Sequence, residues 1–255
     1  MFRYLNHRST GGNTKIEVRG IRSDGTVRER LPAGEIGVLC YDGPNKTPGY
    51  LNPIHNQGLF TEDGFLICGD LGKIDDDGYV YVTGRSKDLI IRGGHNIDPL
   101  IVEEVADKHP DIVLSAAVSR PDSYAGELVA LYVTVKEGSK ITAEELREYM
   151  EKNISERPAL PKAIYILDEI PVTAVGKIYK PKLREDAAKQ VYDEEIATLL
   201  DEGVKIDVDV VTEAGTGMIA KVSIDQQGIE NKNKLEDKLM SIFGKFTIKH
   251  QVIWK

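Results

Sequence analysis

The chain has 255 residues and a net charge of −8, and it is 41% hydrophobic and 29% charged, which is typical of a globular protein with one large or two to three small domains. The acidic balance argues against nonspecific binding to nucleic acid or membranes, and no apolar run approaches the ~18 residues of a membrane span. The first residues lack the apolar core of a secretion signal, and Cys40 and Cys68 show no metal-ligand spacing, so we expect a cytoplasmic location.

Residues 14–85 consist of short apolar or alternating runs bounded by Gly, Asp and Pro, which predict strands and turns without a helix. The stretch DDDGYVYV, residues 75–82, predicts a hairpin with an Asp-Gly turn. We expect a barrel-like subdomain or a pair of hairpins. Because the strand pattern begins almost at once, we also expect that residues 1–85 belong to a larger domain that is truncated here and that the chain is a fragment of a longer protein.

The pattern changes at residue 86. A strand ends at a Gly-Gly turn, and residues 98–110 predict a helix with Asp98 as N-cap and Pro99 in the first position. Two strands follow, then a helix that begins with the capping box Thr142–Glu145, and then another strand. Residues 86–192 are therefore predicted to form a small β-α-β-β-α-β domain.

Residues 193–255 are predicted to form an appended α-β-β-α-β module. Residues 187–203 read as its first helix, and the strand VKIDVDVV places Lys205, Asp207 and Asp209 on one face. We expect that face to be solvated and not to be a ligand site. The fold class that follows for the whole chain is α+β.

The segment PVTAVGKIYKPKLR, residues 171–184, contains a Gly-Lys pair that is not a phosphate loop. Ile178 follows Lys177 where such a loop has Ser or Thr, and the second glycine at the required spacing is missing. By pattern alone, Lys177 and Arg85 are better explained as solvated surface residues than as ligand-binding residues. Asp70, which follows Gly69 at a strand end, is by pattern alone better explained as the cap of a turn than as a ligand-binding residue.

Several motifs taken together resemble the later core motifs of the adenylate-forming superfamily, which comprises acyl-CoA synthetases, adenylation domains of peptide synthetases and luciferases. In chain order the motifs are TPGYLN, FLICGDLG, YVTGRSKDLIIRGGHNI and PVTAVGKIYKPKLR. The resemblance covers residues 14 to about 192 and is greatest to the fatty and aryl acyl-CoA synthetases. It departs from the family in that the Ser/Thr/Gly-rich phosphate loop and the Tyr-Gly-x-Thr-Glu stretch are absent, and Asn96 stands where some relatives carry arginine.

The resemblance implies roles for residues on the nucleotide side of the site. Asp70 resembles the aspartate that binds the ribose hydroxyls of ATP, and Arg85 resembles the arginine beside it that contacts the nucleotide. Lys87 occupies the hinge position between the large and small domains. ATP is then the expected cofactor, and Mg²⁺ arrives with ATP, because the histidines show no ligand spacing and we assign no metal site.

The resemblance also implies roles in the small domain. Gly93, Gly94 and His95 resemble the loop that lines the tunnel for the pantetheine arm of CoA, although a histidine after such a turn is more commonly a polar loop residue. Lys177 resembles the catalytic lysine, whose positive charge stabilises the meeting of a carboxylate with the α-phosphate of ATP. The neighbouring Lys180, Lys182 and Arg184 are expected to be mostly solvated.

The sequence therefore predicts the C-terminal part of an AMP-forming acyl-CoA synthetase that activates a carboxylic acid, with a fatty acid expected, and transfers it to CoA. The expected partners are the acid, ATP, CoA and the N-terminal domain of the same protein, and the isolated chain is expected to be inactive. Two alternatives are an adenylation domain that loads a carrier-protein thiol and a non-catalytic binding subunit that works through residues 193–255. The carrier-protein alternative would be favoured by a downstream helix with an Asp-Ser attachment site, and the sequence has no such helix.

Overall fold

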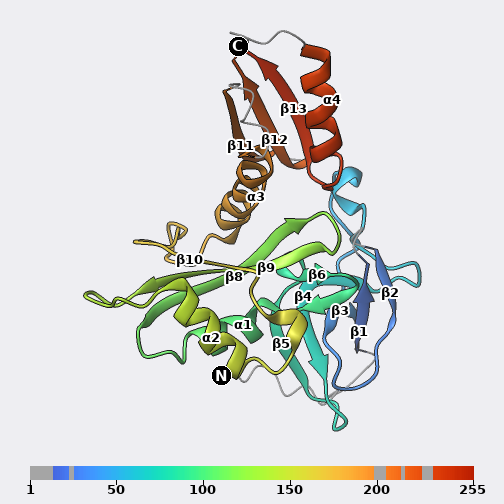
Figure 1. Cartoon of the computed structure of the whole chain (residues 1–255). Helices are drawn as coiled ribbons and strands as arrows, with labels where there is room; N and C mark the ends of the chain where they lie inside the picture. The colour runs from blue at the N-terminus through green and yellow to red at the C-terminus, as the bar shows by residue number, and fades with distance from the viewer. Residues whose placement is uncertain (1–13, 23–25, 198–204, 214–215, 226–231) are drawn as a thin grey trace. The chain divides into compact units, whose positions relative to one another are not determined.

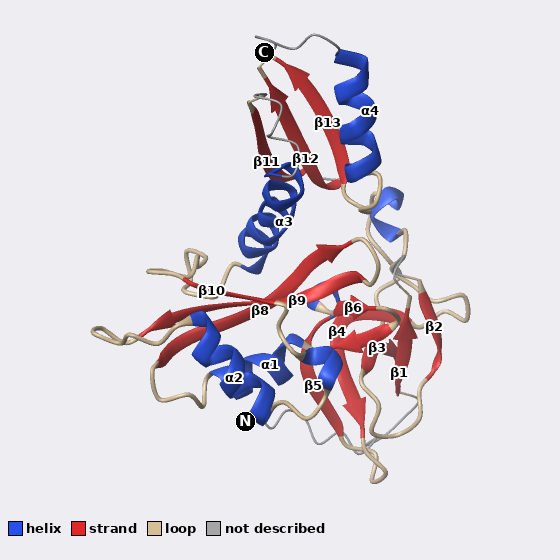
Figure 2. Ribbon diagram, in the orientation of Figure 1, coloured by secondary structure: helices blue, strands red, loops and turns tan. Residues whose placement is uncertain are grey.

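The computed structural model describes residues 14–22, 26–197, 205–213, 216–225 and 232–255 (Figure 1). By their contacts the residues divide into two compact units, one made of residues 1–89 and 94–100 and the other of residues 90–93 and 101–255. Both units contain sheet, and the predicted mixture of helix and strand is confirmed (Figure 2).

The first unit contains an antiparallel sheet of five strands in the order β2-β1-β3-β4-β5. These strands are β1 Lys15–Ile21, β2 Val27–Arg30, β3 Gly37–Asp42, β4 Leu66–Ile74 and β5 Val80–Arg85. Strand β1 buries alternate side chains near its C-terminal end, whereas four consecutive residues of β3 are buried, and Val18, Val38, Cys40 and Leu71 lie in the core. Among the described strands the sheet is open and not closed into a barrel, because β2 and β5 pair with one neighbour each.

The predicted Asp-Gly hairpin between β4 and β5 is confirmed. The Asp75 carboxylate accepts hydrogen bonds from the backbone of Asp77 (3.1 Å) and Tyr79 (2.8 Å), and Gly78 adopts a φ of +84°, which favours glycine. Two 3₁₀ helices, Pro53–Asn56 and Ser86–Asp88, and strand β7 His95–Ile97 complete this unit. The hairpin, together with a register shift between Leu71 and Gly72, places Asp70 opposite Arg85.

The second unit is built on a sheet whose central strand, β9, pairs with three others. The strands are β6 Ile90–Arg92, β8 Ile112–Asp122, β9 Gly126–Val135 and β10 Ala163–Ile166. Strands β6 and β8 are antiparallel to β9, whereas β10 is parallel to it. Among the named strands β8 pairs with β9 alone, so one edge of β8 must find hydrogen-bond partners elsewhere.

Both predicted helices of this region are present. Helix α1 spans Pro99–Ala106, and the Asp98 carboxylate accepts a hydrogen bond from the Leu100 backbone N–H at 3.0 Å. Helix α2 spans Ala143–Asn153 and begins with the predicted capping box, in which Thr142 and Glu145 each accept a hydrogen bond from the backbone of the other. Helix α1 is shorter than the sequence pattern suggests, since residues 107–110 form a turn.

Helix α3, Lys180–Ala197, begins seven residues before the predicted start at residue 187. The pattern was misleading because Lys180-Pro181 reads as loop, whereas a proline in the first turn of a helix loses no hydrogen bond. The N-terminal half of α3 places Leu183 and Ala187 in a core with β8 and β9. The remainder of the predicted helix, residues 198–203, lies outside the described residues.

The C-terminal half of α3 belongs to a second core. Its side chains Ala188, Tyr192 and Ile196 pack against a three-stranded sheet and helix α4, which runs along one face of that sheet (Figures 1 and 2). The elements of this tail module are β11 Ile206–Glu213, β12 Gly217–Ile224, α4 Lys232–Phe243 and β13 Lys249–Trp254. The order α-β-β-α-β agrees with the predicted one, and the face that carries Lys205, Asp207 and Asp209 is exposed, as expected.

Candidate functional site

Asp70 and Arg85 lie opposite each other on adjacent strands at one end of the first sheet. They are register partners, and the Arg85 Nε lies 3.2 Å from the Asp70 Oδ1. The Arg85 side chain is 64% exposed and that of Asp70 is 37% exposed. An exposed ion pair of this kind contributes little to stability, so a ligand can replace it at small cost.

The backbone around this pair has few side chains in the way. Gly69, next to Asp70, has a φ of +74°, and the Gly69 carbonyl accepts a hydrogen bond from the Ser86 hydroxyl at 3.1 Å. That bond ties the end of β4 to the 3₁₀ helix that follows Arg85. The structure therefore brings the two predicted nucleotide-binding residues together on a backbone that is held in place.

Lys87 lies in the middle of the 3₁₀ helix Ser86–Asp88 and its side chain is exposed. The turn is closed by a hydrogen bond of 3.3 Å from the Leu89 N–H to the Ser86 carbonyl. The division between the two compact units falls directly after Leu89. Lys87 thus lies two residues before the point where the chain leaves the first unit.

Gly93 and Gly94 form the tight turn between β6 and β7, and both have positive φ, +54° and +88°. Side chains other than glycine rarely adopt such angles, which explains the Gly-Gly pair. The Gly93 N–H donates a hydrogen bond of 2.8 Å to the Ala125 carbonyl. Both glycines and His95 are exposed, so the turn presents backbone atoms and an imidazole to solvent.

Lys177 follows the tip of a tight hairpin in the second unit and is exposed. The hairpin is closed by an isolated β-bridge between Val172 and Ile178 and by a hydrogen bond of 2.7 Å from the Thr173 N–H to the Lys177 carbonyl. Gly176 supplies the positive φ of +76° that the turn needs. The segment that carries the predicted catalytic lysine is therefore an ordered turn and not a loose loop.

Thr173 also shapes this turn, although no role was predicted for it. The Thr173 Oγ1 accepts a hydrogen bond from the Lys177 N–H at 3.2 Å, and the Thr173 carbonyl accepts one from the Gly176 N–H at 2.8 Å. A threonine four residues before the lysine is a local signal for such a side-chain-to-backbone bond. The same side chain thus fixes the backbone from which Lys177 projects.

The expectation that Lys180 is mostly solvated is wrong. The Lys180 Nζ lies 2.7 Å from the Glu103 Oε1, and the two side chains are only 18% and 15% exposed. Lys182, in contrast, is 62% exposed, as predicted. The two partners of the buried pair are far apart in sequence, so no spacing rule could have joined them.

A second set of charged groups holds α3 on the small sheet. The Tyr132 hydroxyl, in β9, donates a hydrogen bond of 2.7 Å to Asp186, and Arg120, in β8, forms an ion pair with Glu194. Burial, and secondarily the Asp186 carboxylate, raises the pKa of Tyr132, which keeps the hydroxyl protonated as a donor. These contacts join α3 to β8 and β9 and were not predicted.

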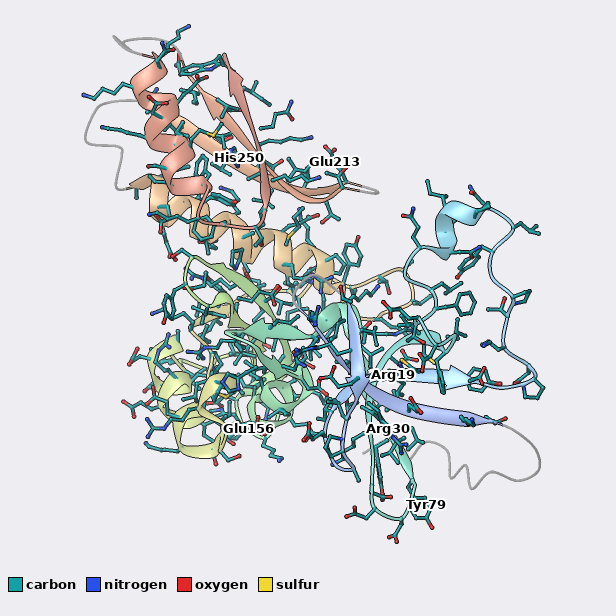
Figure 3. All side chains as sticks on the ribbon, turned by 90° about the vertical axis from the view of Figure 1, so that its right-hand side faces the viewer. Arg19, Arg30, Tyr79, Glu156, Glu213 and His250 are labelled. Carbon is teal, nitrogen blue, oxygen red and sulfur yellow. The ribbon has the colours of Figure 1, made fainter. Side chains whose placement is uncertain are left out.

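A charged surface of the first unit around Arg19 is occupied by its own ion pairs. Arg19, labelled in Figure 3, forms ion pairs with both Glu17 (2.8 Å) and Asp63 (2.5 Å). The hydrogen bond from Arg19 to Asp63 lowers the pKa of Asp63 to about 2. A cavity of about 380 Å³ next to Arg19 is lined largely by charged side chains. Because the charge of Arg19 is already neutralised, we assign this cavity no function.

The described residues show neither a metal cluster nor a membrane-spanning helix. No group of three or more His, Cys, Asp or Glu side chains within the described ranges is arranged to hold a metal ion. Within the same ranges, no helix is long and apolar enough to cross a membrane.

Comparisons with known proteins agree on one family. Residues 101–177 match the family described as "AMP-binding enzyme C-terminal domain". The chain is 43% identical over 208 residues to marinolic acid–CoA ligase of Pseudoalteromonas sp., with 81% of this chain and 32% of that protein covered. It is 38% identical to a long-chain-fatty-acid–CoA ligase of Bacillus subtilis, with 60% and 27% covered.

A solved structure gives the same result. The crystal structure of ATP-bound MatB from Rhodopseudomonas palustris superposes with a TM-score of 0.59 at 34% identity, and the match covers 69% of this chain and 34% of that chain. The chain spans about a third of the length of the curated relatives it matches. The match to the Pseudoalteromonas ligase spans 208 residues, which is longer than the segment 1–192. The match therefore extends into the tail module.

Proposed function

Because this chain is homologous to the C-terminal part of adenylate-forming CoA ligases, we propose that it serves as that part of an AMP-forming acid–thiol ligase. In this proposal the ligase activates a carboxylic acid with ATP, releases pyrophosphate and transfers the acyl group from AMP to CoA. Residues 1–85 complete a large adenylation domain, residues 86–192 form the mobile small domain, and residues 193–255 are appended to it. The division into domains and the cytoplasmic location are part of the proposal.

The observation that carries the proposal is the ordered hairpin that presents Lys177. A carboxylate that attacks the α-phosphate of ATP brings two anions together, and a positive charge at that point stabilises the charge that develops. The hairpin holds the lysine backbone through Thr173 while leaving the side chain exposed. A lysine suits this task because its ammonium is a compact charge on a flexible stem.

The remaining site residues take the other parts of the reaction. Asp70 accepts hydrogen bonds from the ribose hydroxyls of ATP, and Arg85 exchanges its exposed contact with Asp70 for one with the nucleotide. Lys87 lies at the hinge about which the small domain turns. Gly93, Gly94 and His95 line the path of the pantetheine arm of CoA, where the glycines let the thiol pass close to backbone. Mg²⁺ enters with ATP.

We further propose a fatty acid as the substrate. Support comes from the Bacillus subtilis relative, whose name specifies a long-chain fatty acid. The acid pocket is expected in the N-terminal domain, and that domain of the same protein is then the necessary partner of this chain. The isolated chain is proposed to be inactive, because it carries Asp70 and Arg85 without a phosphate loop.

A screen for pyrophosphate release tests the proposal. The complete ligase is incubated with ATP, CoA and one acid at a time from a set of fatty acids of increasing length, aryl acids and dicarboxylic acids. We expect release with at least one fatty acid and its near-complete loss in Lys177→Ala. The matched control is Lys182→Ala, an exposed lysine five residues away, which should keep wild-type release. Equal loss in both variants would contradict the assignment of Lys177.

A further inference from the structure

We infer that Glu103 is a positioning residue for Lys177 and that it acts through Lys180, an inference that rests on the proposed function of Lys177. Glu103 lies on α1, 74 residues before Lys177 in the chain, and no sequence motif connects them. Its carboxylate is 15% exposed and lies 2.7 Å from the ammonium of Lys180, which is 18% exposed. The pair is therefore largely withdrawn from solvent, where an ion pair is less screened than at the surface.

The Glu103 carboxylate also satisfies the free edge of β8. Its Oε1 accepts a hydrogen bond of 2.8 Å from the backbone N–H of Ala117, and Ala117 is completely buried. Since β8 pairs only with β9 among the named strands, this N–H needs a partner from outside the sheet. One carboxylate thus joins helix α1, strand β8 and the first residue of helix α3.

Lys180 connects this junction to the Lys177 hairpin. The hairpin closes where the Tyr179 N–H donates a hydrogen bond of 2.7 Å to the Pro171 carbonyl, one residue before Lys180. The base of the hairpin is further anchored by Ile170, which is buried, and by Ile178, which packs against the same core as Leu183. These apolar contacts hold the base of the hairpin against the core, and the Glu103–Lys180 pair holds the first residue of α3, which directly follows the hairpin.

The consequence for catalysis follows from geometry. A displacement of about 1 Å in a reacting group costs up to ~10²-fold in rate. Lys177 is exposed and reaches its position only through the hairpin, so its placement depends on what holds the hairpin base. Weakening the Glu103–Lys180 pair should therefore slow adenylation while leaving the small-domain sheet intact.

The test uses Glu103→Gln, Lys180→Met and the double variant. Glutamine keeps an oxygen that can accept the Ala117 N–H, so the edge of β8 stays satisfied while the charge pair is lost. We expect each single variant to slow the adenylation half-reaction about tenfold, with the double variant no slower than the singles, because the two residues act as a unit. Lys180→Arg keeps the charge and should restore most of the rate. Thioester formation from supplied acyl-adenylate should change less than adenylation in every variant.

The matched control is a second ion pair in the same unit, Glu148 and Lys152 on α2, whose charged atoms are 3.6 Å apart and whose side chains are 63% and 74% exposed. Glu148→Gln and Lys152→Met should leave both half-reactions unchanged. Hydrogen exchange on the 255-residue chain gives a second readout that does not depend on activity. The amides of Gly176 and Lys177 should exchange faster in Glu103→Gln, whereas amides in the middle of β9 should not.

The outcomes separate this inference from the proposed function. If Lys177→Ala abolishes adenylation while Glu103→Gln and Lys180→Met keep wild-type rates and exchange, the positioning role is wrong and the proposed function stands. If Lys177→Ala has no effect, the proposed function fails, and exchange at Gly176 and Lys177 alone decides whether the pair holds the hairpin. Unchanged exchange at these amides overturns the inference in either case.

Discussion

Charged residues occupy two kinds of environment in this protein, and the contrast between them indicates which ones can bind a ligand. Arg85 and Lys177 are exposed: Arg85 is the last residue of strand β5, and Lys177 follows Gly176 at the tip of a hairpin. Glu103, Lys180 and Arg120, in contrast, are at least four-fifths buried and paired with charges on other elements. The exposed groups are available to a ligand at small cost, whereas the buried groups hold the elements that present them.

Helix α3 makes contacts of different kinds along its length. Its first residue supports the Lys177 hairpin, its middle contacts the small-domain sheet through Asp186 and Tyr132, and its last turns pack into the tail module. Because one helix contributes to both cores of the second unit, a change at one end of α3 bears on the other. The tail module is therefore joined to the core of β8 and β9 by a shared helix and not only by a linker.

The largest expected effect comes from the exposed lysine. Lys177→Ala should lower the rate of adenylation by on the order of 10²-fold or more, as for removal of one preorganised group that stabilises developing charge. Thermal unfolding should be nearly unchanged, since the side chain is exposed. A large fall in thermal stability would place Lys177 among the structural residues and erase the contrast.

Lys87→Pro, at the proposed hinge, should impair thioester formation more than adenylation, the reverse of Lys177→Ala. Proline at position 87 fixes φ near −65° and restricts Ser86, so Lys87→Pro should hinder rotation of the small domain. We expect a loss of about tenfold or more in thioester formation with a smaller loss in adenylation. Lys87→Ala, which keeps the backbone free, is the control and should retain both half-reactions.

The ion pair between the buried Arg120 and the 63% exposed Glu194 should affect stability and not catalysis. Glu194→Gln leaves the Arg120 guanidinium, 9% exposed, with a weaker partner, and should lower the free energy of unfolding of the second unit by about 1–3 kcal/mol. The control is Glu213→Gln on the tail sheet (Figure 3), whose pair with Lys221 is 45% and 35% exposed and should contribute under ~1 kcal/mol. Urea unfolding followed by circular dichroism measures both, and equal losses would contradict the contrast.

The smallest effect should come from a local helix cap. Thr142→Ala removes the side chain that accepts the Glu145 N–H at 3.2 Å, and should cost about 1 kcal/mol of stability without changing either half-reaction. Thr142→Ser keeps the hydroxyl and should restore the stability. A change in catalysis in Thr142→Ala would show that α2 influences the site in a way that its position does not suggest.

The sequence predicted the parts of the fold that depend on local pattern. The alternation of apolar residues predicted the strands. The Thr142–Glu145 spacing predicted the start of α2, and the Asp75–Gly78 turn predicted the hairpin between β4 and β5, because in both cases the interacting residues lie within four positions of each other. The start of α3 was missed because proline reads as a helix breaker, although position two of a helix tolerates it. Local rules therefore work where the deciding contact is local.

The candidate site was only partly predictable for the same reason. Thr173 lies four residues from Lys177 and carried a local signal that could have been used. Glu103 and Lys180 are 77 residues apart, and Arg120 and Glu194 are 74 apart, so these pairs exist only once the chain has folded. The residues that present charge to solvent were thus found from motifs, whereas the residues that position them required the structure.

The most direct test of the central claim is a pre-steady-state assay of both half-reactions in Lys177→Ala and Lys87→Pro. We predict that Lys177→Ala loses adenylation and largely keeps thioester formation from supplied acyl-adenylate, and that Lys87→Pro shows the reverse. If both variants lose both half-reactions equally, the division of roles is wrong, and Lys177 is then better understood as a structural residue of the small domain.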